Sequence, residues 1–234
     1  RITLEGKELK DYSAKEIVQK VGFVFQNPFT QISGVKETVF EEIAFGLENL
    51  ALDAEYIRKR VEETLKLLHI EELRDKNPYE LSGGQGQKVA LASIIAMDPE
   101  IMVIDEPTSQ LDPKGTEEIF EIIDILKKEG KTIILVEHKL ELIAEYAEKV
   151  MVLDEGEMIL SGNTEDVLKN KILIEKEIGI PQYAALAYRL MDEGKVKFDE
   201  IPITKEKAVE VFAHKNFLAE DSKIEENTCQ EEKK

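Results

Sequence analysis

Apolar residues fall into short runs that alternate with stretches of helical spacing over about the first 160 residues. The short runs predict six strands, at 2–4, 21–25, 101–104, 132–136, 149–153 and 157–160. The runs at 101–104 and 132–136 are almost entirely apolar, which is typical of strands buried on both faces. Strands that alternate with helices indicate an α/β fold with a largely parallel sheet.

Helical spacing and end signals place the helices between these strands. A helix over about 54–70 carries its apolar residues on one face, behind a candidate N-cap at Asp53. Another begins at Asp112 and ends at Gly130, because an N-cap acid and a terminal glycine favour those positions. Other helices are expected at about 14–20, 84–97 and 139–148.

These elements divide the chain into three regions. Residues 1–162 form the α/β domain, and the helical block at about 34–98 is predicted to be a subdomain inserted into it. Residues 163–216 are expected to form a helical C-terminal extension. Residues 217–234 are rich in acids and are expected to be a disordered tail.

Composition narrows the class of protein. Apolar residues at 42% and charged residues at 34% fit a globular chain, and no apolar stretch reaches the ~20 residues that span a bilayer. The formal charge is −18, which argues against a nucleic-acid partner because a phosphate-binding surface needs positive charge. The single cysteine, Cys229, excludes an internal disulfide framework and suits a reducing compartment.

Residues 81–85 read Leu-Ser-Gly-Gly-Gln at the start of a predicted helix. Ser82 and Gln85 have the spacing of a capping box. The paired glycines, Gly83 and Gly84, lower helix stability and remove side chains where a backbone approaches a ligand. Such a helix N-terminus presents free N–H groups, so the segment predicts an anion-binding site.

Two carboxylates, Asp105 and Glu106, follow the apolar run 101–104. In parallel sheets, ligands bind where the strands have their carboxyl ends. We assign Asp105 to Mg²⁺, held partly through water, and Glu106 to the general base that polarises an attacking water. Pro107 disfavours a helical backbone in the preceding residue, so Glu106 is expected to be extended.

Three other polar residues are candidates for the same site, and each has an ordinary structural interpretation as well. Gln26 follows the 21–25 run and is either a metal and water ligand or a loop glutamine. His138 follows the 132–136 run, where a lone histidine is more often structural than catalytic. Asp112 is a helix N-cap, and that role is compatible with one in the site.

Four segments occur in the order and at the spacing of one family: VFQNP around Gln26, LSGGQ at 81–85, IMVIDEPTSQLD at 101–112 and VEH ending at His138. Over about residues 1–160 the chain therefore resembles ATP-binding-cassette (ABC) ATPases. The segment from Gln26 to Leu50 and the region 178–213 further resemble ATPase subunits of energy-coupling factor transporters. The resemblance implies a P-loop NTPase-type parallel sheet, with an inserted helical subdomain and a helical C-terminal extension.

The resemblance also implies roles for the candidate residues. Gln26, Glu106 and His138 correspond to catalytic positions, and Asp105 and Gln26 to positions that hold Mg²⁺. Asp112 corresponds to the D-loop, which follows the acidic strand end. ATP held by a partner chain would contact the signature residues Leu81, Ser82, Gly83, Gly84 and Gln85.

In this family, two such chains form a head-to-tail dimer that closes on ATP and opens after hydrolysis. The resemblance therefore implies an ATPase subunit that uses ATP and Mg²⁺ to drive import of a vitamin or a transition-metal ion. Its partners would be a second ABC ATPase subunit, identical or related, and an integral membrane subunit. The chain would lie peripherally on the cytoplasmic face of the cell membrane.

The chain departs from the family pattern in its phosphate loop. No G-x-x-x-x-G-K-[ST] motif occurs, and Gly130-Lys131-Thr132, which imitates its end, lacks the required glycine at Ile125. We expect that the sequence starts downstream of that loop and that this chain alone is inactive. The alternative is a non-catalytic subunit that donates only its signature to a partner's site, although a degenerate subunit has no need of Glu106 and His138.

Smaller departures lie near the signature and the D-loop. Gly86 and Lys88 stand where the family usually has a basic residue and an arginine, and Gln110 is an uncommon D-loop residue. A glycine in a helix costs up to ~1 kcal/mol. DNA-repair and chromosome-organising ATPases with the same head are disfavoured, because the chain has no heptad run and its charge has the wrong sign for DNA.

Overall fold

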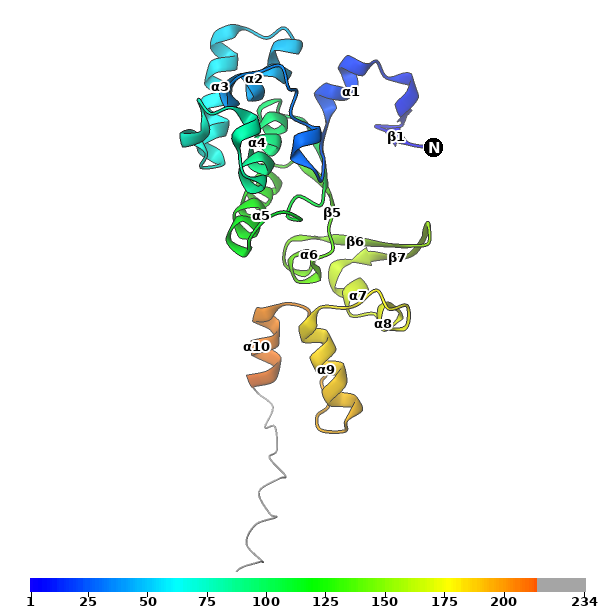
Figure 1. Ribbon diagram of the computed structural model, residues 1–234. Coiled ribbons are helices and arrows are strands. Elements are labelled where there is room, and N and C mark those ends of the chain that lie inside the picture. The colour runs from blue at the N-terminus through cyan, green and yellow to red at the C-terminus, as the bar shows by residue number, and fades with distance from the viewer. Residues whose placement is uncertain (214–234) are drawn as a thin grey trace, which may run out of the picture. The chain divides into compact units, whose positions relative to one another are not determined.

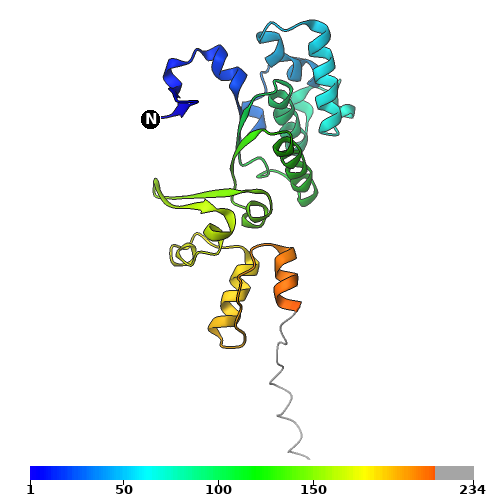
Figure 2. The same cartoon turned by 180° about the vertical axis from the view of Figure 1, so that it is seen from behind.

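The computed structural model describes residues 1–213 and divides the chain into two compact units, 1–138 and 139 onward (Figures 1 and 2). The predicted tail, 217–234, and the end of the predicted extension, 214–216, lie outside the described residues. Each unit is described by itself. Within residues 1–213, no helix is both long and apolar enough to span a membrane.

The first unit is built around a parallel sheet. The strands of this unit are β1 (Thr3–Leu4), β2 (Lys7–Glu8), β3 (Val21–Val24), β4 (Ile101–Asp105) and β5 (Thr132–Val136). Among the described residues β4 lies between β3 and β5, and all three run parallel, whereas β1 and β2 form a separate antiparallel pair. The predicted α/β fold with a parallel sheet is confirmed.

The helices of this unit are α1 (Ala14–Lys20), α2 (Val39–Asn49), α3 (Ala54–Leu67), α4 (Gly83–Ala96) and α5 (Pro113–Lys128). Helices α1, α3, α4 and α5 lie where the apolar spacing and capping residues placed them, and α2 lies inside the helical block predicted at about 34–98. Short 3-10 helices are η1 (Leu9–Asp11), η2 (Pro28–Thr30), η3 (Glu71–Leu73) and η4 (Pro78–Glu80). Asp53 accepts hydrogen bonds from the N–H groups of Glu55 and Tyr56, which confirms it as the N-cap of α3.

One hydrophobic core joins a single face of the sheet to the helices α2 to α5. Val24, Met102 and Ile104 supply the sheet side, and apolar residues of the four helices supply the rest. The helix α4 is buried on most sides, which explains why its apolar residues follow no single stripe. The core therefore holds α4 against the strands that carry the candidate site.

The opposite face of the sheet differs from the prediction. Strands β4 and β5 were expected to be buried on both faces, but Ile134 is 47% exposed and Val136 is 45% exposed. Phe23 of β3, in register with Val103 and through it with Ile134, is also exposed. Buried and open positions alternate because neighbouring side chains of a strand point to opposite faces, and in the described residues only one face is covered.

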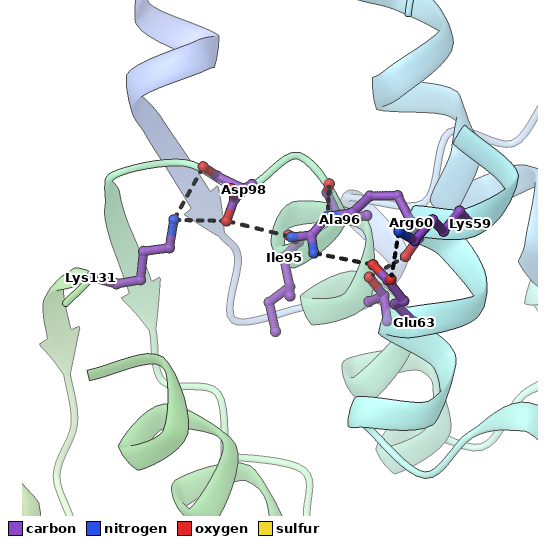
Figure 3. Close-up of polar contacts among 8 residues, drawn as sticks. Lys59, Arg60, Glu63, Ile95, Ala96, Asp98 and Lys131 are labelled. Carbon is purple, nitrogen blue, oxygen red and sulfur yellow. Dashed lines mark hydrogen bonds and ion pairs between the residues drawn. The ribbon is translucent and has the colours of Figure 1, made fainter. Parts of the chain in front are cut away.

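A polar junction ties the C-terminal end of α4 to its neighbours (Figure 3). Arg60 of α3 donates to the carbonyls of Ile95 and Ala96 in the last turn of α4, and the Ile95 carbonyl also accepts from the Asp98 N–H. Asp98 accepts from Lys131 Nζ at 2.8 Å, and its carboxylate lies 3.4 Å from Arg60. The Gly-Lys-Thr segment that imitates a phosphate loop thus places its lysine at a helix end.

The second unit has strands β6 (Lys149–Asp154) and β7 (Glu157–Asn163), which form an antiparallel ribbon with an irregularity at Val152/Leu153. Its helices are α6 (Leu140–Tyr146), α7 (Thr164–Leu168), α8 (Ile172–Glu175), α9 (Gln182–Asp192) and α10 (Lys205–Ala213). A small core gathers Ala144, Leu168, Ala184 and Ile203. Between Asn163 and Ala213 the described residues form the four helices α7 to α10.

Candidate functional site

Three predicted residues meet around one carboxylate at the carboxyl edge of the sheet. Gln26, just beyond β3, donates from Nε2 to Glu106 Oε2 at 2.6 Å. His138, just beyond β5, places Nε2 2.6 Å from Glu106 Oε1. These three residues are brought together because β3, β4 and β5 are parallel and end at the same edge.

The carboxylate is more shielded than the histidine that contacts it. The Glu106 side chain is 22% exposed, whereas that of His138 is 78% exposed. Both oxygens of Glu106 have a polar partner, and one ring nitrogen of His138 is engaged. The arrangement presents a carboxylate that can accept a proton, next to two groups that hold its orientation.

The backbone of Glu106 corrects the prediction of an extended conformation. Its φ is +42°, in the left-handed region. The residue ends the ladder with an N–H bond to Val136 and begins a turn, because its carbonyl accepts from Ser109. Proline disfavours a right-handed helical residue before it, and a left-handed residue is another way to satisfy that restriction while turning the chain. Such a residue in a site stores about 1–3 kcal/mol of strain.

Two further residues, Thr108 and Glu137, form hydrogen bonds at the end of β5. Thr108 is buried, and its hydroxyl donates to Glu137 Oε1. The other oxygen of Glu137 accepts from the N–H of His138 at 2.9 Å. The loop after Glu106 is thereby linked to the backbone that positions His138.

Asp105 lies on the open face of the sheet, in register with Val136. Residues 1–213 contain no group of three or more His, Cys, Asp or Glu side chains placed to hold a metal ion. Mg²⁺ commonly takes only one or two protein carboxylates and fills its other positions with water and phosphate oxygens. The oxygens of Asp105 and Gln26 fit that donor set.

The 81–85 segment forms the N-terminus of α4 as a capping box. Ser82 Oγ accepts from the Gln85 N–H, and Gln85 Oε1 accepts from the Ser82 N–H, which confirms the predicted cap. Ser82 is exposed, whereas Leu81 is 6% exposed and belongs to the core. Ser82 to Gln85 therefore border the solvent, and Leu81 anchors them.

Because Gly83 and Gly84 have no Cβ, the side chains of Gln110 and Leu111 can lie close to the start of α4. A Cβ on Gly83 would lie 3.0 Å from Gln110 Oε1, and one on Gly84 would lie 3.1 Å from Leu111 Cδ2. Gln110 and Leu111 come just before Asp112, which caps α5 by accepting from the Gly115 N–H at 2.7 Å. The predicted N-cap role of Asp112 is confirmed.

The N-termini of α4 and α5 border one cavity of about 500 Å³. On its wall, Lys88 of α4 and Glu118 of α5 form an ion pair at 2.5 Å. The hydrogen bond from Lys88 lowers the pKa of Glu118. The lysine at a position where an arginine was expected thus ties the two helices together, close to both helix starts.

Gly86 is the next glycine of α4, and replacing it by alanine is expected to stabilise the folded protein. A Cβ at this position would meet Phe29 Cζ at 3.5 Å and Pro28 Cγ at 3.6 Å, which are ordinary contact distances. Gly86→Ala should therefore raise the free energy of unfolding by about 0.5–1 kcal/mol, measured by urea denaturation. The matched change Gly84→Ala meets Leu111 at 3.1 Å and should gain less. Equal gains for both variants would contradict the packing argument.

Sequence reasoning missed the side chains that connect these elements. The Lys88–Glu118 pair, the Thr108–Glu137 bond and a bridge made by Gln31 join residues 29 to 62 positions apart. Each residue type is ordinary at its position, and no short-range pattern marks it. The sequence placed Lys88 in the predicted helix, but its partner, Glu118, could be identified only from the packing of α4 against α5.

The chain is similar in sequence and in fold to ATPases of ABC transporters. The family model described as ABC transporter matches residues 1–109. The chain is 42% identical to the energy-coupling factor transporter ATP-binding protein EcfA2 of Streptococcus thermophilus, over 91% of this chain and 75% of that protein.

Two solved structures are also similar. CbiO1 of Clostridium perfringens, part of the ABC transporter complex cbiONQ, has a TM-score of 0.65 and 35% identity, over 84% of this chain and 76% of that one. The dimeric ATP-binding cassette MJ0796, in a post-hydrolysis state with ADP and Pi, has a TM-score of 0.61 and 30% identity. That match covers 69% of this chain and 72% of the other.

Proposed function

Since the chain belongs to the ABC transporter ATPase family, we propose that it is the ATP-hydrolysing subunit of an energy-coupling factor importer. It couples hydrolysis to uptake of a vitamin or a transition-metal ion. The observation that carries this proposal is the Glu106 carboxylate, contacted at 2.6 Å by both Gln26 and His138. A subunit that only lent its signature to a partner would not need this cluster.

Glu106 is the general base in this proposal. Its carboxylate takes a proton from the water that attacks the terminal phosphate of ATP. Gln26 and His138 each occupy one site on a different oxygen of Glu106, and each oxygen keeps a second lone pair that can accept a hydrogen bond from water. Both partners of the carboxylate, Gln26 and His138, are exposed to solvent.

Asp105 and Gln26 would hold Mg²⁺ at the same edge of the sheet. When bound, the ion supplies positive charge to the phosphate oxygens. The side-chain oxygen of Gln26 is the atom free to ligate the metal, because the Nε2 of the same amide already donates a hydrogen bond to Glu106. This division lets one glutamine respond both to the ion and to the base.

Ser82, Gly83, Gly84 and Gln85 contact ATP held by a second subunit. The glycine-opened N-terminus of α4 provides N–H groups and a positive dipole end for phosphate. Asp112 lies beside this N-terminus and joins the two half-sites of a head-to-tail pair. An ATP site completed by two subunits implies a dimer, and the transport role implies an integral membrane subunit that holds the pair at the cytoplasmic face.

Reconstitution into liposomes tests the function. The full-length protein that carries this sequence, within its assembled ATPase pair and with the membrane subunits, should support MgATP-dependent uptake of one labelled vitamin or of Co²⁺ or Ni²⁺, whereas residues 1–234 alone, which contain no G-x-x-x-x-G-K-[ST] motif, should not. Uptake should stop when ADP replaces ATP. Full uptake with Glu106→Gln in this subunit would instead support the non-catalytic alternative, and ATP hydrolysis without uptake of any ligand in the panel would argue against an importer.

A further inference from the structure

One side chain connects the end of strand β3 to the middle of α4. Gln31 lies just after the 3-10 helix η2, in the segment that leads from Gln26 to α2. Its Oε1 accepts from the Phe25 N–H at 3.1 Å. Its Nε2 donates to the Ala90 carbonyl at 2.6 Å and to Ser93 Oγ at 3.1 Å.

Both ends of this bridge lead to residues of the candidate site. Phe25 directly precedes Gln26, which contacts Glu106. Ala90 lies eight residues after Ser82 in the numbering of α4, about 12 Å along a helix that rises 1.5 Å per residue. Gln31 therefore joins the backbone that carries Gln26 to the helix whose first turn carries Ser82.

The chemistry of the bridge requires an amide. Its oxygen must accept from Phe25 while its nitrogen donates to α4, and among side chains of this length only glutamine does both. Glutamate keeps the acceptor and loses the donor. Leucine loses both at similar size. The two halves of the bridge can therefore be removed separately.

The segment around Gln31 is held at other points, so the bridge has a defined place. Asn27 caps η2 through its contact with the Phe29 N–H at 3.1 Å. Further on, the buried carboxylate of Glu42 accepts from both the N–H and the hydroxyl of Ser33, at 2.7 Å each. These hydrogen bonds tie the segment to itself and to α2. Pro28 and Phe29 pack near Gly86 of α4, and among the hydrogen bonds named here only those of Gln31 reach α4.

We propose that Gln31 is a positioning residue that sets the place of Gln26 relative to the signature end of α4. Through it, a change in the contact between Gln26 and Glu106 is coupled to the position of Ser82. This inference rests on the proposed ATPase function. It predicts that loss of the bridge misplaces Gln26, which lowers kcat more than it changes KM for ATP.

The test measures ATP hydrolysis by the assembled transporter with Gln31→Leu and Gln31→Glu. Both variants should lower kcat about tenfold, since a displacement of a catalytic group by a fraction of an ångström has effects of this order, while KM changes less than about threefold. Hydrogen exchange at the Phe25 amide should speed up in Gln31→Leu and stay slow in Gln31→Glu, which retains the acceptor. The exposed Gln19 of α1 provides the control Gln19→Leu, which should leave both constants unchanged.

A double-mutant cycle separates positioning from general destabilisation. If Gln31 acts through Gln26, then Gln31→Leu should have no further effect on kcat in a Gln26→Ala background. An unchanged kcat in Gln31→Leu, or the same loss with and without Gln26, would overturn the inference. An unsubstituted transporter that hydrolyses no ATP would instead overturn the proposed function, and the inference with it.

Discussion

Replacement of Glu106 by glutamine is expected to reduce kcat for ATP hydrolysis about 10³-fold, within the range that general acid–base catalysis contributes. Glutamine has the same size but cannot take a proton from water. Its single oxygen can still accept a hydrogen bond from Gln26, so ATP binding and the fold should be retained. The measurement is steady-state phosphate release by the assembled transporter, with nucleotide binding determined separately.

Ser82→Arg is the companion variant, because it blocks the signature side of the shared site and leaves Glu106 intact. If two identical copies pair head to tail, a mixed pair of Glu106→Gln and Ser82→Arg copies has both lesions in one site and none in the other. Random pairing then restores about a quarter of the sites. Phosphate release by Glu106→Gln alone at the original rate would contradict the assignment of the base.

The largest loss of stability is expected for Gly22→Ala. Gly22 is a buried residue of β3, and a Cβ there would lie 2.3 Å from Ile94 Cγ2 and 2.9 Å from Pro99 Cγ. Neither neighbour is the free end of a long side chain, so β3 and the end of α4 must separate. Overpacking of this kind costs about 3 kcal/mol, measured as a fall in the free energy of unfolding in urea.

Two comparisons isolate the cause of that loss. Gly162→Ala in β7 adds the same methyl group at an ordinary 3.5 Å from Val167 Cγ2, so its cost should be small. Ile94→Ala removes Cγ2, the atom closest to the added methyl group, so Gly22→Ala should cost less stability in an Ile94→Ala background than in the unsubstituted chain. If Gly22→Ala is no less stable than Gly162→Ala, the close packing of β3 on α4 is wrong.

The capping residues and the strands of the candidate site could be read from short-range patterns. Asp53, Ser82 and Asp112 act as N-caps as expected, because a cap depends on a side chain and the N–H groups two or three residues later. The parallel strands followed from apolar runs of the right length. The cluster of Gln26, Glu106 and His138 was also predictable, since each residue follows a strand and parallel strands end at one edge.

Two predictions, the extended backbone of Glu106 and the burial of β5 on both faces, were wrong because each assumed the usual surroundings of that residue type. Pro107 made an extended Glu106 the better expectation, yet the turn after β4 places Glu106 at a φ of +42°. An apolar composition indicated that β5 is buried on both faces, yet Ile134 and Val136 are exposed. Composition shows what a strand can bury, whereas only the placement of the helices decides which face is covered.

The sequence by itself determined most of the helices and strands, the N-caps of α3, α4 and α5, and the sheet edge where the polar residues meet. Tertiary structure alone decided the contacts that hold those elements in place. Gln31 reaches Ala90 across 59 positions, and Lys131 reaches Asp98 across 33. The physical reason is that propensity, capping and periodicity act within a few residues, whereas a hydrogen bond between distant residues exists only once packing has brought its donor and acceptor within about 3 Å.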